Sequence, residues 1–179
     1  MDKVIYYFVI GSFIGWIMEV TFKTISGENI NRAGMGKGPF CAAYGVGIAF
    51  IAVNMSKYSN NTLWLFISTA VIGTIYEHIL GTFMEKVFGI ILWDYTKLKF
   101  YINRHICLEF VILWGIFGTL FITKVLPILN LIYSYINLKQ VINIIYILAI
   151  YICIDYGFSA FKLLSTKKDS EENEIKISE

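Results

Sequence analysis

The sequence predicts an all-α fold, a polytopic membrane helix bundle with about five transmembrane helices. Of its 179 residues, 57% are hydrophobic and 16% are charged, whereas roughly a quarter of the residues of a soluble domain are charged. A helix needs about 20 mostly apolar residues to cross a bilayer. Five apolar runs come near that length, and only the second is short: residues 4–22, 39–55, 62–83, 106–125 and 141–164.

These runs divide the chain into two parts. We expect residues 1–164 to form one integral membrane domain. The first run is too long for the apolar core of a signal peptide and contains Glu19, so we interpret it as a membrane helix. Residues 165–179 have mixed charge and few apolar side chains, which predicts a disordered cytoplasmic tail.

The distribution of cations predicts the orientation. With five crossings, only Lys3, Lys57, Lys124 and Lys139 lie on the side of the amino terminus, and eleven Lys or Arg residues lie on the other side. Cytoplasmic loops carry the excess of Lys and Arg. The amino terminus is therefore expected outside and the carboxyl terminus in the cytoplasm. The net charge of +2 gives no indication of nucleic acid as a partner.

Two helices carry small and acidic residues four positions apart. The first has Gly11, Gly15 and Glu19, and the third has Gly73, Glu77, Gly81 and Glu85. Residues at this spacing share one helix face, and glycines on that face allow another helix to approach closely. An Asn-Arg pair and then a cysteine follow each helix, namely Asn31-Arg32 with Cys41 and Asn103-Arg104 with Cys107. The pattern fits two parallel helical-hairpin repeats, although chance matches at helix ends would produce it too.

A polar stretch separates the third and fourth runs. Residues 83–93 are apolar but contain Glu85, Lys86 and Gly89, and they are too short to span, so we expect a re-entrant or interfacial segment. Trp93 and Tyr95, on either side of Asp94, are residue types that settle at the headgroup level. Membrane anchoring alone would also explain them.

Ionisable side chains inside spans are costly, so they usually pair or line a cavity. We expect Glu19 and Glu77 to converge with Arg32 and Arg104 on a polar pocket open to the cytosol, although mutually satisfied ion pairs would use the same residues. No residue is predicted to be catalytic, and no metal or cofactor is expected, because close-spaced ligand pairs are missing from the sequence. The predicted ligand-binding residues are Glu19, Arg32, Glu77, Glu85, Trp93, Asp94, Tyr95, Asn103 and Arg104.

A combination of motifs carries a family resemblance. It comprises Gly15-Trp16 with Glu19, Asn31-Arg32, Gly38-Pro39, Cys41, Tyr44-Gly45, Trp93-Asp94-Tyr95, Asn103, Ile106-Cys107 and Trp114-Gly115. In these motifs the chain resembles the bacterial ABC-transporter permease family called CmpB-like or type IV. The resemblance implies a multi-pass protein of the bacterial cell membrane, a permease component whose ATPase would be a separate polypeptide.

Three functions remain open at this point. The leading hypothesis is a transport component for an unassigned small solute, embedded in the lipid bilayer and assembled as a homo- or hetero-oligomer through its glycine stripes. In it, Glu19 and Glu77 hold cationic groups or protons, and Arg32 and Arg104 hold anionic groups or an ATPase surface. The alternative is a membrane-embedded enzyme acting on a lipid or lipid-linked substrate, with Glu77 or Asp94 as base. In it, Arg32 and the segment Gly34–Gly38 hold a phosphate. The third is a scaffold or sensor.

Overall fold

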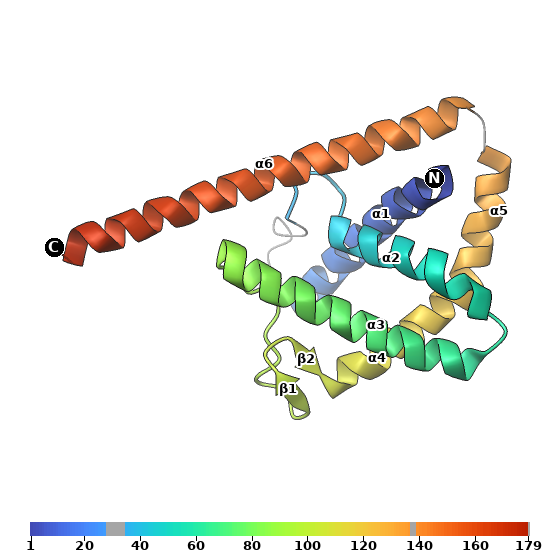
Figure 1. Cartoon of the computed structure of the whole chain (residues 1–179), viewed down its shortest axis with the longest axis horizontal. Helices are drawn as coiled ribbons and strands as arrows, with labels where there is room; N and C mark the ends of the chain where they lie inside the picture. The colour runs from blue at the N-terminus through green and yellow to red at the C-terminus, as the bar shows by residue number, and fades with distance from the viewer. Residues whose placement is uncertain (28–34, 137–138, 179) are drawn as a thin grey trace.

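The computed structural model describes residues 1–27, 35–136 and 139–178. It confirms the all-α class and the helical bundle (Figure 1). The predicted site residue Arg32, its neighbour Asn31 and Gly34 lie outside the described residues. The α-helices are α1 (Asp2–Ser26), α2 (Ala42–Met55), α3 (Thr62–Phe83), α4 (Leu108–Leu120), α5 (Leu126–Ile136) and α6 (Lys139–Ser178).

Shorter elements link these helices. A 3-10 turn, η2 (Ser56–Tyr58), follows α2, and two π-helical turns, η3 (Met84–Phe88) and η4 (Phe121–Val125), extend α3 and α4. Two short antiparallel strands, β1 (Tyr101–Asn103) and β2 (Ile106–Cys107), precede α4. α6 is helical as far as Ser178 and so includes most of the predicted tail. The disorder of that tail, and the division of the chain at residue 164, stay predictions.

Four helical stretches of the described chain are long and apolar enough to cross a membrane. They are Asp2–Ile25, Thr62–Phe88, Leu108–Tyr135 and Lys139–Lys168. α2 coincides with the second predicted crossing but has 14 residues. At 1.5 Å per residue it is about 21 Å long, less than the roughly 30 Å of hydrocarbon. Its crossing therefore stays a prediction.

The first four helices form two hairpins, α1 with α2 and α3 with α4, and in Figure 1 these hairpins have the same direction. α1, α3 and α6 run one way and α2 and α4 run the other. In each hairpin a glycine of the first helix lies against an aromatic residue of the second. A Cβ atom on Gly73 would lie 2.7 Å from Trp114 Cγ, and one on Gly15 would lie under 3.0 Å from Tyr44 Cβ.

The glycine stripes therefore pack inside the chain. This use explains the predicted close approach of helices, because only a hydrogen atom fits between the paired backbones and rings. It also removes the reason for expecting oligomers through these glycines. Oligomerisation stays a prediction, and it would need another surface.

α6 crosses the hairpins and closes the core. Tyr6, Leu65, Ile122 and Ile152 are fully buried where these helices meet. The hydroxyl of Tyr6 also donates a hydrogen bond to the carbonyl of Leu129, at 3.2 Å. Many large apolar side chains remain exposed on the outer faces, as expected when acyl chains cover them.

The helix formed by α4 and α5 changes direction between the two elements in Figure 1. The π-helical turn η4 lies at the change, and Pro127 follows it. A proline inside a helix removes one backbone donor, and its ring clashes with the preceding turn. Kinks commonly occur at prolines and π-helical turns, so the sequence accounts for the bend.

Candidate functional site

The face of α3 that carries Gly73, Glu77, Gly81 and Glu85 lies against α4 and the α3–α4 loop, which we define as residues 89–107. Trp114 of α4 covers Gly73. Tyr95 and Trp114 reach Glu77, and Arg104 and His105 reach Glu85. The spacing of four predicted one shared face, and the structure gives each position on that face a partner from the loop or from α4.

Glu77 is the buried acid of this site, with 5% of its surface exposed. The hydroxyl of Tyr95 donates to its Oε1 at 2.6 Å, and Nε1 of Trp114 donates to its Oε2 at 2.8 Å. Tyr95 is fixed in turn by stacking on Phe110, with ring centroids 4.4 Å apart. Both carboxylate oxygens are thus satisfied inside the protein, as a polar group in a membrane span requires.

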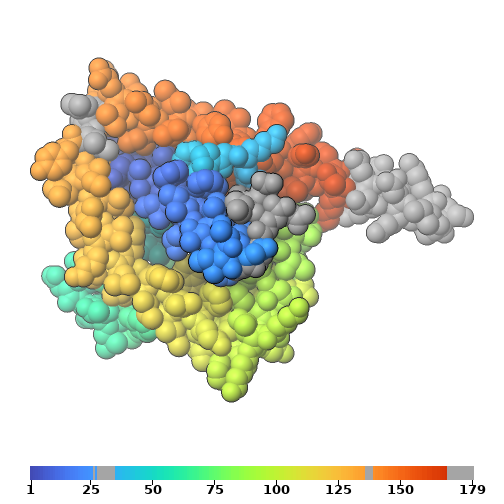
Figure 2. Space-filling model, turned by 180° about the vertical axis from the view of Figure 1, so that it is seen from behind, coloured from blue at the N-terminus to red at the C-terminus, as the bar shows by residue number. Residues whose placement is uncertain are grey.

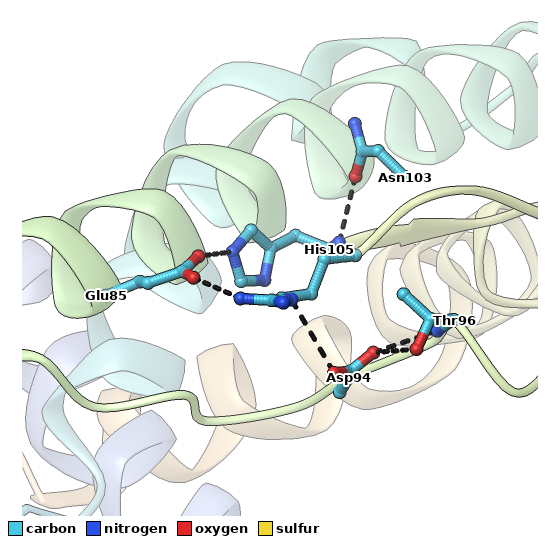
Figure 3. Close-up of polar contacts among 6 residues, drawn as sticks. Glu85, Asp94, Thr96, Asn103 and His105 are labelled. Atoms are coloured by element: carbon cyan, nitrogen blue, oxygen red, sulfur yellow. Dashed lines mark hydrogen bonds and ion pairs between the residues drawn. The ribbon is translucent and has the colours of Figure 1, made fainter.

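Glu85 lies two turns after Glu77, in the π-helical turn η3 that extends α3, and belongs to an ion-pair network drawn in Figure 3. Arg104 Nη1 contacts Glu85 Oε1, His105 Nε2 lies 2.8 Å from Glu85 Oε2, and Arg104 Nε lies 3.5 Å from Asp94 Oδ2. Arg104, Glu85 and Asp94 are partly exposed, and ion pairs between exposed side chains contribute little to stability, whereas the ring of His105 is buried. The network therefore positions charge more than it stabilises the fold.

Asp94 is fixed from the other side by Thr96. Its Oδ1 accepts hydrogen bonds from the Thr96 backbone amide at 2.9 Å and from the Thr96 hydroxyl at 2.6 Å (Figure 3). These two bonds, and then the charge of Arg104, hold the pKa of Asp94 below its ordinary value of 3.8. Asp94 is therefore ionised at neutral pH.

Backbone hydrogen bonds shape the α3–α4 loop. The amide of Tyr95 donates to the carbonyl of Arg104 at 2.9 Å, which brings together two residues nine positions apart. Asn103 Oδ1 accepts from the amide of His105 at 2.8 Å, a local turn that asparagine favours. β1 pairs with β2 directly before α4 begins. The loop is thus a folded element that aims its side chains at α3.

The ring of His105 occupies the place that a side chain at position 81 would take. A Cβ atom on Gly81 would lie 2.8 Å from His105 Nδ1 and 3.1 Å from Trp93 Cζ2. His105 is only 4% exposed. Within the described residues, its Nδ1, Nδ1 of the nearby His78 and Nε1 of Trp93 have no hydrogen-bond partner.

Glu19 lies in the other hairpin. Its Oε1 is 2.9 Å from Nζ of Lys23, one turn further along α1. No hydrogen bond or ion pair between described residues joins Glu19 to Glu77 or Arg104. The two acids are therefore not direct partners, although both lie within electrostatic reach of Tyr44 of α2.

The glycine segment before α2 is held by α6. Asp155 Oδ1 accepts from the amide of Lys37 at 3.1 Å, and its Oδ2 accepts from the amide of Gly38 at 2.9 Å. The Tyr156 hydroxyl accepts from the amide of Ala42 at 3.0 Å. An internal carboxylate thus occupies amides that could otherwise cradle an anion, which favours the simpler interpretation of a close-packed turn.

Of the predicted binding residues, the structure brings seven together on α3 and the α3–α4 loop: Glu77, Glu85, Trp93, Asp94, Tyr95, Asn103 and Arg104. Sequence reasoning did not include Trp114 in the site, and it considered His105 only as a counter-charge at the loop boundary, without adding it to the predicted binding residues. Their signals were the position of His105 directly after Asn103-Arg104 and the Trp114-Gly115 pair in an apolar helix. In the described part of the chain, no group of three His, Cys, Asp or Glu residues is placed to hold a metal ion.

Comparison with known proteins places the chain in a family. No curated protein and no solved structure matches it. The family model described as "Putative ABC-transporter type IV" matches residues 6–160, which include both hairpins and most of α6. The match extends past residue 120, where the motif resemblance ends, and it confirms that resemblance. The chain belongs to the family of putative ABC-transporters of type IV.

Proposed function

We propose that this chain is the permease component of a transport system in the bacterial cell membrane, and that α3 with the α3–α4 loop forms its solute site. Family membership and the four apolar helices support a membrane transport protein. The observation that carries the proposal is the buried carboxylate of Glu77 beside a partly exposed rim of charge. An ionisable residue within a membrane span is by default a functional candidate, because its burial is costly.

The rim suits a small charged solute. Arg104 presents a guanidinium group with 42% of its side chain exposed, and the acids Glu85 and Asp94 flank it at 33% and 40%. Arginine recognises carboxylate or phosphate groups through paired hydrogen bonds, whereas the two acids would bind a cationic group. A solute that carries both charges would bind by replacing the ion pairs that Arg104 forms with Glu85 and Asp94.

We place this site on the cytosolic side, with the amino terminus outside. The α3–α4 loop, the segment before α2 and the end of α6 lie at one end of the bundle, because Asp155 binds the amides of Lys37 and Gly38, and Lys167 Nζ donates to the carbonyl of Val87 at 3.2 Å. Most of the chain's cations lie at this end. The excess of cations favours the cytoplasm, and a separate ATPase would bind there.

The proposal is tested by transport and by copurification. Comparing the small-molecule content of cells with and without the chain identifies the solute, and E77Q should abolish the difference while the variant still inserts in the membrane. E109Q is the matched control, because Glu109 is an exposed acid at the start of α4. Purification from native membranes in mild detergent should recover an ATPase subunit. Normal transport by E77Q would remove Glu77 from the site.

The enzymatic alternative is less well supported by the same residues. A general base must lie within hydrogen-bond reach of the substrate proton that it takes. Glu77 is only 5% exposed, and its two oxygens face the side chains of Tyr95 and Trp114, so a substrate has little access to it. A lipid-linked product formed by the purified chain and lost in E77Q would nevertheless favour the enzyme over the permease.

A further inference from the structure

A second site is suggested by a surface pocket of about 250 Å³ beside α6. One wall is a single face of α6, where Tyr151, Ile154, Asp155, Phe158, Ser159 and Lys162 recur at helical spacing. The other wall contains Lys37, from the segment before α2 that Asp155 holds. In Figures 1 and 2 this segment lies directly against α6, some 115 residues away in the chain.

The charged groups of the pocket favour an anion. No carboxylate of the described chain forms an ion pair with Lys37 or Lys162. Asp155 is the one acid in the lining, and both its oxygens accept hydrogen bonds from the backbone amides of Lys37 and Gly38. The carboxylate keeps its charge, but two ammonium groups against one carboxylate leave the lining net positive, with the hydroxyl of Ser159 as a further donor. A phosphate ester matches these donors.

The apolar groups of the pocket point to a lipid. Ile154 and Phe158 are 62% and 75% exposed, and they lie on a helix that is apolar enough to span the membrane as far as Lys168. The pocket lies near the end of that span, where Lys162, Lys167 and Lys168 follow. Basic pockets at this depth bind the headgroups of anionic lipids.

We propose that this pocket binds the headgroup of one anionic phospholipid, with its phosphate at Lys37 and Lys162 and its acyl chains along Ile154 and Phe158. The size of the pocket agrees, because 250 Å³ is below the roughly 300–1,000 Å³ of pockets that enclose whole small molecules. It accommodates a headgroup and leaves the chains in the bilayer. The bound lipid would join the segment before α2 to α6.

The test measures lipid retention by the purified full chain with native mass spectrometry, using phosphatidylglycerol against phosphatidylcholine. A lysine near an anionic surface contributes about fivefold in affinity. The double variant K37Q/K162Q should therefore bind phosphatidylglycerol about 30-fold more weakly, and K37R/K162R should retain binding. Phosphatidylcholine should bind weakly to all variants.

The control K97Q/K99Q removes the same charge from exposed positions of the α3–α4 loop at the same end of the bundle. It should leave phosphatidylglycerol binding within about twofold of the wild-type value, given the locality of such contacts. An equal loss of phosphatidylglycerol binding in this control would show that the lipid is attracted by the overall positive charge of this end of the bundle. That result would refute a specific lipid site in the pocket. Glycerophosphoglycerol, which lacks acyl chains, should not compete at 100-fold excess. Competition by it would overturn the lipid in favour of a soluble phosphate ester.

Discussion

Replacing Gly73 by alanine should loosen the second hairpin without affecting the first. The added methyl group would lie 2.7 Å from Trp114 Cγ and 2.8 Å from Trp114 Cβ, whereas ordinary contacts begin at 3.4 Å. Because Trp114 Cβ is fixed to the backbone of α4, the two helices must separate by about 0.6 Å. Overpacking of this kind costs about 1–3 kcal/mol. Alanine returns about 0.5–1 kcal/mol through its better helix propensity, so the net loss lies between about 0 and 2.5 kcal/mol, with a central value of about 1 kcal/mol.

Buried cysteines make this loss measurable. Cys107 is fully buried next to α4, and Cys41 is buried at the start of α2. In a chain whose only cysteine is Cys107, maleimide labelling in detergent reports the opening of the second hairpin, since only the open form reacts. At 1.4 kcal/mol per tenfold, the central value predicts that G73A raises the labelling rate about fivefold. In a chain whose only cysteine is Cys41, the rate should change little.

The matched control is G157A in α6. No atom lies within 4 Å of the position its methyl group would take, so alanine adds helix propensity without a clash. Labelling of Cys107 should then stay constant or become slower. The reasoning is refuted if G73A labels at the wild-type rate or if G157A accelerates labelling to the same degree. Either outcome would show that the labelling rate of Cys107 does not depend on the packing of Gly73 on Trp114.

Two further changes test the α3–α4 loop. Because the folded pKa of Asp94 is lowered, its contribution to the loop is present above the ordinary pKa of 3.8 and is lost as pH falls through the lower folded value. We therefore expect the fluorescence of Trp93 to show an acid transition below pH 3.8, with W93F as the control that identifies the signal. T96A should move the midpoint of this transition to higher pH. An unchanged midpoint in T96A would contradict the role of Thr96. Y95F leaves one oxygen of buried Glu77 without its donor, so it should lower the free energy of unfolding by about 1–3 kcal/mol. A chemical-unfolding midpoint equal to wild type would show that water replaces the hydroxyl.

The stripe on α3 could be predicted from the sequence because it follows from helix geometry alone. Residues four apart share a face whatever surrounds them, so Glu77 and Glu85 were expected on one side of the helix. The partners of that face depend on tertiary packing. His105 and Trp114 became visible only when the loop folded back, since the hydrogen bond from Tyr95 to the carbonyl of Arg104 fixes the direction of the loop.

The expected meeting of Glu19 with Glu77 shows where such reasoning stops. The glycine that lets a return helix approach lies on the same face as the acid one turn away, as Gly15 does beside Glu19. Glu19 therefore faces its hairpin partner α2, where Tyr44 lies within electrostatic reach of both Glu19 and Glu77. Asp155 is likewise tied to its own neighbours, because it accepts hydrogen bonds from the amides of Lys37 and Gly38.

The two hairpins differ at the position one turn after the acid of their first helix. One turn after Glu19 the chain has Lys23, which forms an ion pair with it inside α1. One turn after Glu77 it has Gly81, which supplies no countercharge and leaves room for the rings of His105 and Trp93. Glu77 must then obtain both of its donors from outside α3, and it does so from Tyr95 and Trp114. A packing glycine in place of a lysine thus makes the acid of the second hairpin depend on the loop and α4, so that a movement of that loop would change the stability of its charge.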